Sequence, residues 1–193
     1  MTTDTMNRPA KIAMNGVNVP TLLATIGAVA EQPALAQFTF RARSEWAAGT
    51  YSRTRINDYA GAGGEHAREA GEFVVEADHP AVLCGADHGP TPGEYLLAAL
   101  ASCITAGIGN IASARQVTLR SVKGTVEGDA DLQGILGIDK TVRNGFSAIR
   151  ARFEIDGDAP REVLEKIVHQ SMARSAVLDM LTNGTTVDVD VAA

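Results

Sequence analysis

The residue best suited to chemistry in this sequence is Cys103, in the middle of the apolar stretch from Gly89 to Gln116. A cysteine thiolate is a strong nucleophile, and a thiol on the flank of an interior helix can be covered by a second element yet reached through a cleft. The alternative is that Cys103 is simply a small core residue, because free cysteine is among the most buried residue types. The residues alone leave both interpretations open.

A second cysteine and four histidines give only a weak case for a metal. Cys84 lies between His79 and His88 in a segment that we expect to be a loop, and His66 and His169 lie far from it in the sequence. One thiol and two histidines on a loop lack the ligand spacing of a zinc site, so we expect no metal and no cofactor. Two cysteines are too few for a disulfide scaffold, and they indicate a reducing, cytoplasmic compartment.

Basic side chains gather before the apolar stretch. Residues Thr50–Ile56 alternate with a period of two, which places Tyr51, Arg53 and Arg55 on one face of a strand. This face is either solvated or directed at a site, and for any single arginine solvation is the default.

The stretch that carries Cys103 has the pattern of one long helix. Thr91, Pro92 and Glu94 form a capping box: a threonine N-cap, proline at the first helical position and glutamate three residues after the cap. At about 100° per residue the apolar face consists of Leu97, Leu100, Ile104, Ile108 and Ile111. Cys103 lies about 100° from this stripe, on a flank of mostly small residues that another backbone could approach closely.

The segments before this helix predict an extension followed by strands. Residues 1–17 are polar and we expect them to be loose, and a helix follows from Asn18 to near Pro33. Alternation at Phe38 and Phe40 and again at residues 50–56, with Gly49 in the connection, predicts an antiparallel hairpin. Residues 60–64 form a glycine-rich turn, residues 72–77 a short strand, and residues 79–89 a loop.

The segments after the helix predict strands and two shorter helices. Residues 117–132 have the pattern of a strand interrupted at Gly124, residues 134–145 of a loop, and residues 146–156 of a strand. Asp158 is expected to cap a helix, Ser175 a short second one, and residues 185–191 to form a closing strand. This order defines an α+β fold in which the long helix needs a sheet or a partner to cover it.

Composition limits the classes of partner. The chain has 193 residues, enough for one domain with an extension, and its 45% apolar and 21% charged residues are ordinary for a globular protein. A net charge of −6 argues against nucleic acid or an anionic membrane as a partner. We find no uninterrupted apolar run of the roughly 18 residues that a membrane span requires.

The segment GPTPGEYLLAALASC resembles the signature of the OsmC/Ohr family, the osmotically inducible protein C and organic hydroperoxide resistance proteins. The family carries a Pro-x-Glu-Leu-Leu-type helix start and a cysteine on that helix. The resemblance extends from about Phe38 to the C-terminus, which leaves residues 1–36 as an N-terminal extension with a short helix and 37–193 as an OsmC-like domain. It implies a long central helix packed against antiparallel sheets in an intertwined homodimer, with thiol sites at the subunit boundary.

The resemblance also implies a chemistry. In active members the helix cysteine attacks an organic hydroperoxide and becomes a sulfenic acid, which a second cysteine resolves. A strand arginine and a glutamate near the helix start steer the peroxide and hold the thiolate. Carried over, these catalytic positions are Cys103, Arg53 and Glu94, and the arginines that remain open as alternatives to Arg53 are Arg41, Arg43 and Arg55. Cys103 lies too far along its helix for that helix's own dipole to activate it, so we expect a nearby cation.

Two departures from the family pattern matter. The family's second cysteine opens a Cys-Pro-Val segment, but here Ser175 precedes Ala176 and Val177, and a hydroxyl cannot form the resolving disulfide. Gly93 follows the proline, so Glu94 is displaced by one position to about 180° from Cys103, and a capping role for it competes with a catalytic one.

Cys84 is a remaining candidate for the resolving cysteine. Cys103 would lie about 16–18 Å along the helix from its cap, a distance that a loop thiol of the same chain has to cover. In a swapped dimer the partner's loop could lie nearer.

These observations support more than one function. The first is thiol-dependent reduction of small organic hydroperoxides through a single peroxidatic cysteine, Cys103, recycled by an external thiol reductant in oxidative stress defence. The alternative is a homodimer without peroxidase chemistry that binds an apolar small molecule in its subunit cleft, and a purely structural role is the third.

Overall fold

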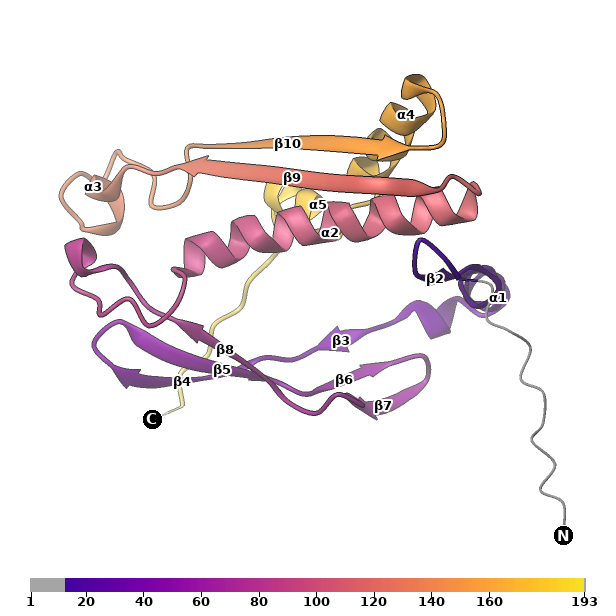
Figure 1. The fold of residues 1–193 in the computed structure, drawn as a ribbon. Helices are drawn as coiled ribbons and strands as arrows, with labels where there is room; N and C mark the ends of the chain where they lie inside the picture. Colours follow the sequence, from indigo (N-terminus) through magenta and orange to yellow (C-terminus); the bar gives the residue numbers. More distant parts are fainter. Residues whose placement is uncertain (1–12, 193) are drawn as a thin grey trace, which may run out of the picture.

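The structure is a computed structural model and describes residues 13–192. The long helix α2 (Pro92–Ala114) runs along one side of two long strands, β9 (Leu119–Asp129) and β10 (Ala148–Gly157), as Figure 1 shows. A separate group of short strands lies on the opposite side of α2. The thiol-bearing helix therefore runs between two layers of antiparallel sheet.

From residue 13 to residue 77 the chain forms one α-helix, one 3-10 helix and eight short strands. In chain order the elements are β1 (Ala13–Met14), β2 (Val17–Asn18), α1 (Val19–Glu31), the 3-10 helix η1 (Pro33–Ala36), β3 (Thr39–Phe40), β4 (Arg43–Ala48), β5 (Tyr51–Ile56), β6 (Asp58–Gly61), β7 (Gly64–Ala67) and β8 (Phe73–Ala77). They form a β1-β2 hairpin and two three-stranded sheets, ordered β3-β6-β7 and β4-β5-β8. The predicted helix before Pro33 is confirmed, with Asn18 as its N-cap.

The predicted hairpin around Gly49 exists, but only part of the expected sequence belongs to it. Gly49 has a φ of 57° in the turn between β4 and β5. Phe40 instead pairs with Tyr59 of β6, so the Phe38–Phe40 run belongs to the other sheet. The physical reason is side-chain contact, because the Phe38 ring stacks on Tyr59 at a centroid distance of 6.1 Å and the Phe40 ring lies tilted against it at 6.0 Å.

The remaining elements are the 3-10 helix η2 (Ala81–Leu83) just before α2 and, after it, β9, α3 (Leu132–Ile135), β10, α4 (Arg161–Ala173) and α5 (Ala176–Asn183). Of these, β9, α4 and α5 contact α2, and β10 contributes side chains to the same core. The predicted interruption of β9 at Gly124 is wrong, since β9 pairs with β10 through this residue. Gly124 lies opposite Phe153, and a Cβ there would approach the Phe153 ring to 2.6 Å, so the glycine accommodates the ring without ending the strand.

The two predicted caps after β10 have different outcomes. Asp158 does not cap α4, whose N-cap is Pro160; its carboxylate instead accepts a hydrogen bond from the backbone N–H of Thr118, at 2.6 Å. Ser175 does cap α5, accepting from the N–H of Leu178 at 3.2 Å. Asp158 thus links the residue that follows β10 to the residue that precedes β9.

Residues 13–18 are not loose, contrary to our expectation, whereas residues 1–12 lie outside the described part of the chain. Asn15, at the tip of the β1-β2 hairpin, donates to the Val117 carbonyl at 2.9 Å and accepts from the Leu119 N–H at 2.8 Å. Ser113 of α2 donates to the Met14 carbonyl at 2.7 Å. The hairpin therefore binds the carboxyl end of α2 and the start of β9.

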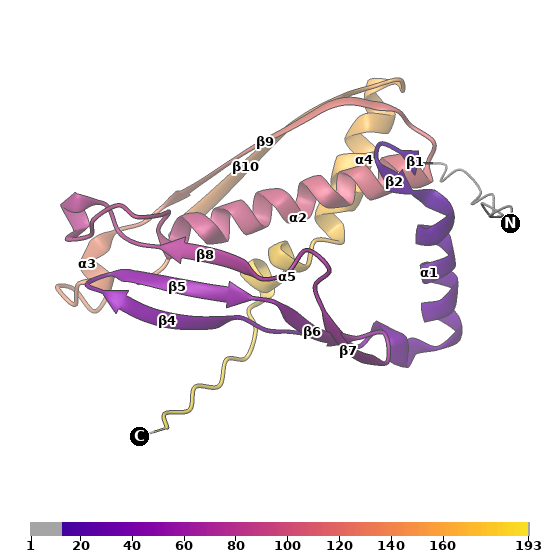
Figure 2. The same cartoon turned by 60° about the horizontal axis from the view of Figure 1, so that its bottom comes forward.

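The predicted closing strand at residues 185–191 does not form within the chain. This segment leaves α5 as an extended trace, visible in Figure 2, and Val187, Val189 and Val191 are about four-fifths exposed at 78%, 83% and 82%. A strand requires a neighbouring edge to pair with, and no strand of residues 13–192 lies beside it.

The core forms along the predicted apolar stripe of α2. Leu100, Ile104, Ile108 and Ile111 are buried, whereas Leu97 is only partly buried. They pack with β9 and with α4, where Ile167 is fully buried. By length and composition alone α2 could cross a membrane, and one stripe of it packs into the core of the chain.

Candidate functional site

The Cys103 thiol lies at the amino-terminal end of α5. Its Sγ accepts a hydrogen bond from the Ser175 hydroxyl at 3.2 Å, and the backbone N–H groups of Ala176 and Val177, in the first turn of α5, also lower the pKa of the thiol. Cys103 is partly buried and Ser175 is buried. The first turn of one helix thus covers a sulfur carried in the middle of another.

These contacts set the protonation of the thiol. Burial is the largest single influence and raises the pKa of Cys103, because an apolar surrounding disfavours the thiolate. The Ser175 hydroxyl and the two backbone amides together outweigh burial and leave the pKa below its ordinary value. A helix amino terminus favours a negative charge for the same reason, since its free N–H groups point outward.

The source of this activation differs from the expected one. A cation was predicted because the dipole of α2 fades long before Cys103, yet the observed donors come from the start of a different helix, 72 residues further along the chain at Ser175. The cap at Ser175 was readable from the sequence, but its placement against Cys103 was not. The one signal for that contact was the resemblance, which puts the family's second cysteine at position 175.

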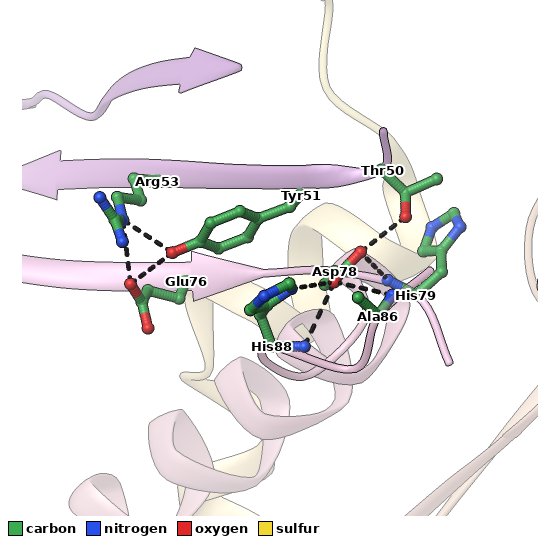
Figure 3. A network of polar contacts seen from close by, with 8 residues as sticks. All are labelled: Thr50, Tyr51, Arg53, Glu76, Asp78, His79, Ala86 and His88. Atoms are coloured by element: carbon green, nitrogen blue, oxygen red, sulfur yellow. Dashed lines mark hydrogen bonds and ion pairs between the residues drawn. The ribbon is translucent and has the colours of Figure 1, made fainter. Parts of the chain in front are cut away.

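Arg53 lies in a polar cluster on the β4-β5-β8 sheet (Figure 3). Its Nε donates to the Tyr51 hydroxyl oxygen at 2.7 Å and to Oε1 of Glu76 at 3.0 Å, and the Tyr51 hydroxyl donates to the same carboxylate oxygen at 2.6 Å. Within the described residues Arg53 makes no hydrogen bond to Cys103. The chain alone therefore does not unite the predicted arginine with the predicted thiol.

Glu94 serves as the helix cap. Its Oε2 accepts from the backbone N–H and from the hydroxyl of Thr91, each at 2.8 Å, and the Glu94 N–H donates back to Thr91 at 3.2 Å. These bonds hold the pKa of Glu94 below its ordinary value. The predicted capping box is confirmed, and its carboxylate is exposed at the start of α2, away from Cys103.

A buried carboxylate that sequence reasoning missed, Asp78, lies at the end of β8. It accepts hydrogen bonds from the Thr50 hydroxyl, from the backbone N–H groups of His79, Ala86 and His88, and from Nδ1 of His88 at 2.7 Å (Figure 3). With Thr50 and His88 as the leading causes, these bonds hold the pKa of Asp78 well below its usual range. Asp78 therefore fixes the loop that leads into α2, and nothing in its sequence context distinguished it.

Cys84 belongs to this loop. It is exposed, has a left-handed φ of 64°, and forms no disulfide. The side chain bonded to the Cys103 sulfur is Ser175, so the structure gives no intrachain contact that supports Cys84 as the resolving cysteine. Among residues 13–192, no group of three or more histidine, cysteine, aspartate or glutamate side chains is arranged to hold a metal ion.

Comparison with known proteins agrees with this fold. The sequence model of the OsmC-like protein family matches residues 85–190, more than half of the chain, so the protein belongs to the OsmC-like family. No curated protein sequence matches the chain.

Several solved structures share its fold. An OsmC-like protein from Mycoplasma pneumoniae is 15% identical with a TM-score of 0.57, over 80% of this chain and 96% of that one. An organic hydroperoxide resistance protein OsmC from Legionella pneumophila is 16% identical with a TM-score of 0.54, over 77% and 93% of the two chains. An organic hydroperoxide resistance protein from Elizabethkingia anophelis is 13% identical with a TM-score of 0.53, over 76% and 90%. At these identities the likeness establishes the α+β fold alone.

Proposed function

We propose that this protein is a thiol-dependent peroxidase that reduces small organic hydroperoxides through Cys103 and contributes to defence against oxidants. The observation that carries the proposal is the hydrogen bond from the Ser175 hydroxyl to the Cys103 sulfur at the start of α5, where the amides of Ala176 and Val177 also favour a negative charge. They favour the thiolate, which is the nucleophilic form, and a buried thiol without such donors would remain protonated and inert.

The reaction begins with attack of the thiolate on the terminal oxygen of the hydroperoxide. The S–O bond forms as the O–O bond breaks, and the leaving alkoxide takes a proton to become an alcohol. Cys103 is oxidised to a sulfenic acid, and the peroxide is reduced.

Recycling requires a thiol from outside the chain, because position 175 carries a serine. One external thiol condenses with the sulfenic acid, releasing water and leaving a mixed disulfide. A second external thiol attacks that disulfide, which restores Cys103 and releases the external reductant as its own disulfide.

The proposed active form is a homodimer, for which the exposed surface is the main argument. The β4-β5-β8 sheet carries exposed apolar side chains, including Trp46 at 76% and Val74 at 50%. A second copy would cover such surface, and it would offer the Arg53 of one subunit to the Cys103 of the other.

The decisive experiment is stopped-flow measurement of the oxidation of Cys103 by cumene hydroperoxide. It uses the Cys84→Ser variant, so that the measured oxidation comes from Cys103 alone. We expect a rate constant at least about a hundredfold above that of free cysteine, because the donors preorganise the thiolate. Cys103→Ser is the control and should be silent.

A rate no faster than that of free cysteine would end the proposal. The alternative, binding of an apolar small molecule in a subunit cleft, would then be tested by thermal-shift screening with fatty acyl and aromatic ligands, where saturable stabilisation is the expected sign.

A further inference from the structure

We infer that Glu76 and Tyr51 are positioning residues for the peroxidase reaction, which hold Arg53 by one edge of its guanidinium so that the other edge can bind the reacting oxygen. The inference rests on the proposed function and concerns residues to which neither the sequence pattern nor the family resemblance assigned a role.

The contacts leave a defined part of Arg53 free. Its Nε donates both to Glu76 and to the Tyr51 hydroxyl, and its guanidinium carbon lies 5.3 Å from the centre of the Tyr51 ring. Neither terminal nitrogen of Arg53 donates to any residue of the described chain. Because a guanidinium is planar, fixing the Nε edge fixes the direction of the terminal nitrogens as well.

The other candidate arginines are bound differently. Arg41 and Arg43 use their terminal nitrogens on the carboxylates of Asp58 and Glu65, and Arg55 uses one terminal nitrogen on Glu72. Their anion-binding groups are therefore already occupied. Of the four predicted candidates, Arg53 is the one that is held through Nε alone, with both terminal nitrogens left free by the described residues to bind an anion.

Tyr51, one of the two partners of Arg53, is itself held by His88, which is bonded to a buried carboxylate. The Tyr51 ring stacks on the His88 imidazole, with centroids 4.4 Å apart, and Nδ1 of His88 is bonded to Asp78 (Figure 3). Asp78 is only 1% exposed and is bonded to the backbone on both sides of the loop. Tyr51 is thus braced by a rigid group, which limits how far the Arg53 guanidinium can tilt.

This arrangement also accounts for the displaced glutamate at the helix start. Glu94 is engaged by Thr91 in the helix cap, so its carboxylate is not available to orient an arginine. Glu76 approaches Arg53 from the neighbouring strand, in direct register with it across β5 and β8. The carboxylate that orients the arginine thus comes from the sheet instead of from the helix.

The test compares matched variants in the full-length protein, all in the Cys84→Ser background. Glu76→Gln and Tyr51→Phe remove the two partners of the Nε edge, and Glu72→Gln removes the partner of Arg55 on the same sheet as a control. Two rates of Cys103 are measured across pH: oxidation by cumene hydroperoxide and alkylation by neutral iodoacetamide. Melting temperatures confirm that each variant folds.

A positioning role makes a specific prediction. Oxidation should fall roughly tenfold in Glu76→Gln and in Tyr51→Phe, because a misplaced guanidinium no longer meets the reacting oxygen. Alkylation and its pH midpoint should change by less than about twofold, since the donors of α5 hold the thiolate. Loss of the negative charge of Glu76 leaves the positive charge of Arg53 uncompensated, which by itself should speed oxidation. A fall in the oxidation rate therefore reports lost orientation of the guanidinium.

The possible failures are distinguishable. If Arg53→Ala slows oxidation but Glu76→Gln and Tyr51→Phe do not, or if Glu72→Gln slows it equally, the inference is wrong and the proposed function stands. If Arg53→Ala has no effect while Cys103→Ser abolishes the reaction, Arg53 has no role and the inference is again wrong. An inert parent protein would overturn the proposed function and this inference with it.

Discussion

At the scale of single residues, Ser175 decides both the reactivity and the fate of Cys103. Its hydroxyl caps α5 through Leu178 and at the same time donates to the thiol at 3.2 Å. One side chain therefore joins the start of a helix to the sulfur that the helix activates. Because the two roles share one oxygen, a substitution that removes the hydroxyl removes both.

Replacement of Ser175 by alanine should weaken the thiolate. Burial of Cys103 persists while its side-chain donor is lost, so the pKa of Cys103 should rise. The thiol is protonated below its pKa, and the fall in oxidation rate at low pH should therefore begin at a higher pH than in the parent. The lost N-cap should also cost about 1 kcal/mol of unfolding free energy. An unchanged pH–rate curve would contradict this, and Ser175→Thr, which keeps the hydroxyl, is the control.

Replacement of Ser175 by cysteine should install a resolving thiol. The Ser175 oxygen already lies 3.2 Å from the Cys103 sulfur, so a small rotation brings two sulfurs to bonding distance. In the Cys84→Ser background, one equivalent of peroxide should consume both thiols and give an intramolecular disulfide, measured by thiol titration and intact mass. Persistent sulfenic acid, or a disulfide only between chains, would show that the two positions do not approach as described.

The residue scale also shows where sequence reasoning stops. The position of Cys103 on the flank of α2 and the capping role of Glu94 could both be predicted from local spacing. A helix fixes the angle between any two residues on it. Glu76 and Asp78 could not be found in this way, because their roles depend on which strand lies next to β8 and how the following loop folds. Side-chain partners across a sheet are set by register, which a single sequence specifies weakly.

At the scale of elements, long periodic segments were predictable and pairings were not. The bounds of α2 agree with its cap and apolar stripe, and α1 and α5 begin after the caps assigned to them. The hairpin at Gly49 was located, but Phe38 and Phe40 were assigned to the wrong sheet. Stacking on Tyr59 decided that pairing, and alternation alone carries no information about which strand lies opposite.

Gly124 gives a direct test at this scale. Substitution by alanine would bring a Cβ to 2.6 Å from the Phe153 ring, so we expect a loss of about 1–3 kcal/mol in unfolding free energy. The exposed neighbour Thr125→Ala should change it by less than about 0.5 kcal/mol in the same denaturant titration. Combining Gly124→Ala with Phe153→Leu should recover part of the loss. A fully additive double mutant would refute the proposed contact.

At the scale of the whole molecule, the chain leaves apolar surface that it does not cover. The sheet β4-β5-β8 and the valines of residues 185–191 remain largely exposed, although the resemblance predicts an intertwined dimer. The alternation of Val187, Val189 and Val191 predicted a strand that the described chain does not form, because a strand forms only where an edge is available to pair with it. In the proposed homodimer that edge belongs to the second copy.

Removal of residues 185–193 should therefore weaken the dimer. Loss of strand pairing and of three valines is expected to raise the dissociation constant at least about tenfold, measured by light scattering on serial dilution. A chain that lacks only residues 192–193 is the control and should match the parent. If the shortened and full chains dissociate alike, the carboxyl-terminal segment does not contribute to the interface.

The contact of the β1-β2 hairpin with the end of α2 has a consequence for biosynthesis. Asn15 and its partner Ser113 are separated by 98 residues of chain. At a translation rate of 5–20 residues per second, the hairpin is synthesised about 5–20 s before that partner. Throughout that interval the hairpin lacks the end of α2 and the start of β9, which it contacts in the folded chain, so a chaperone bound to the hairpin acts before these contacts can form.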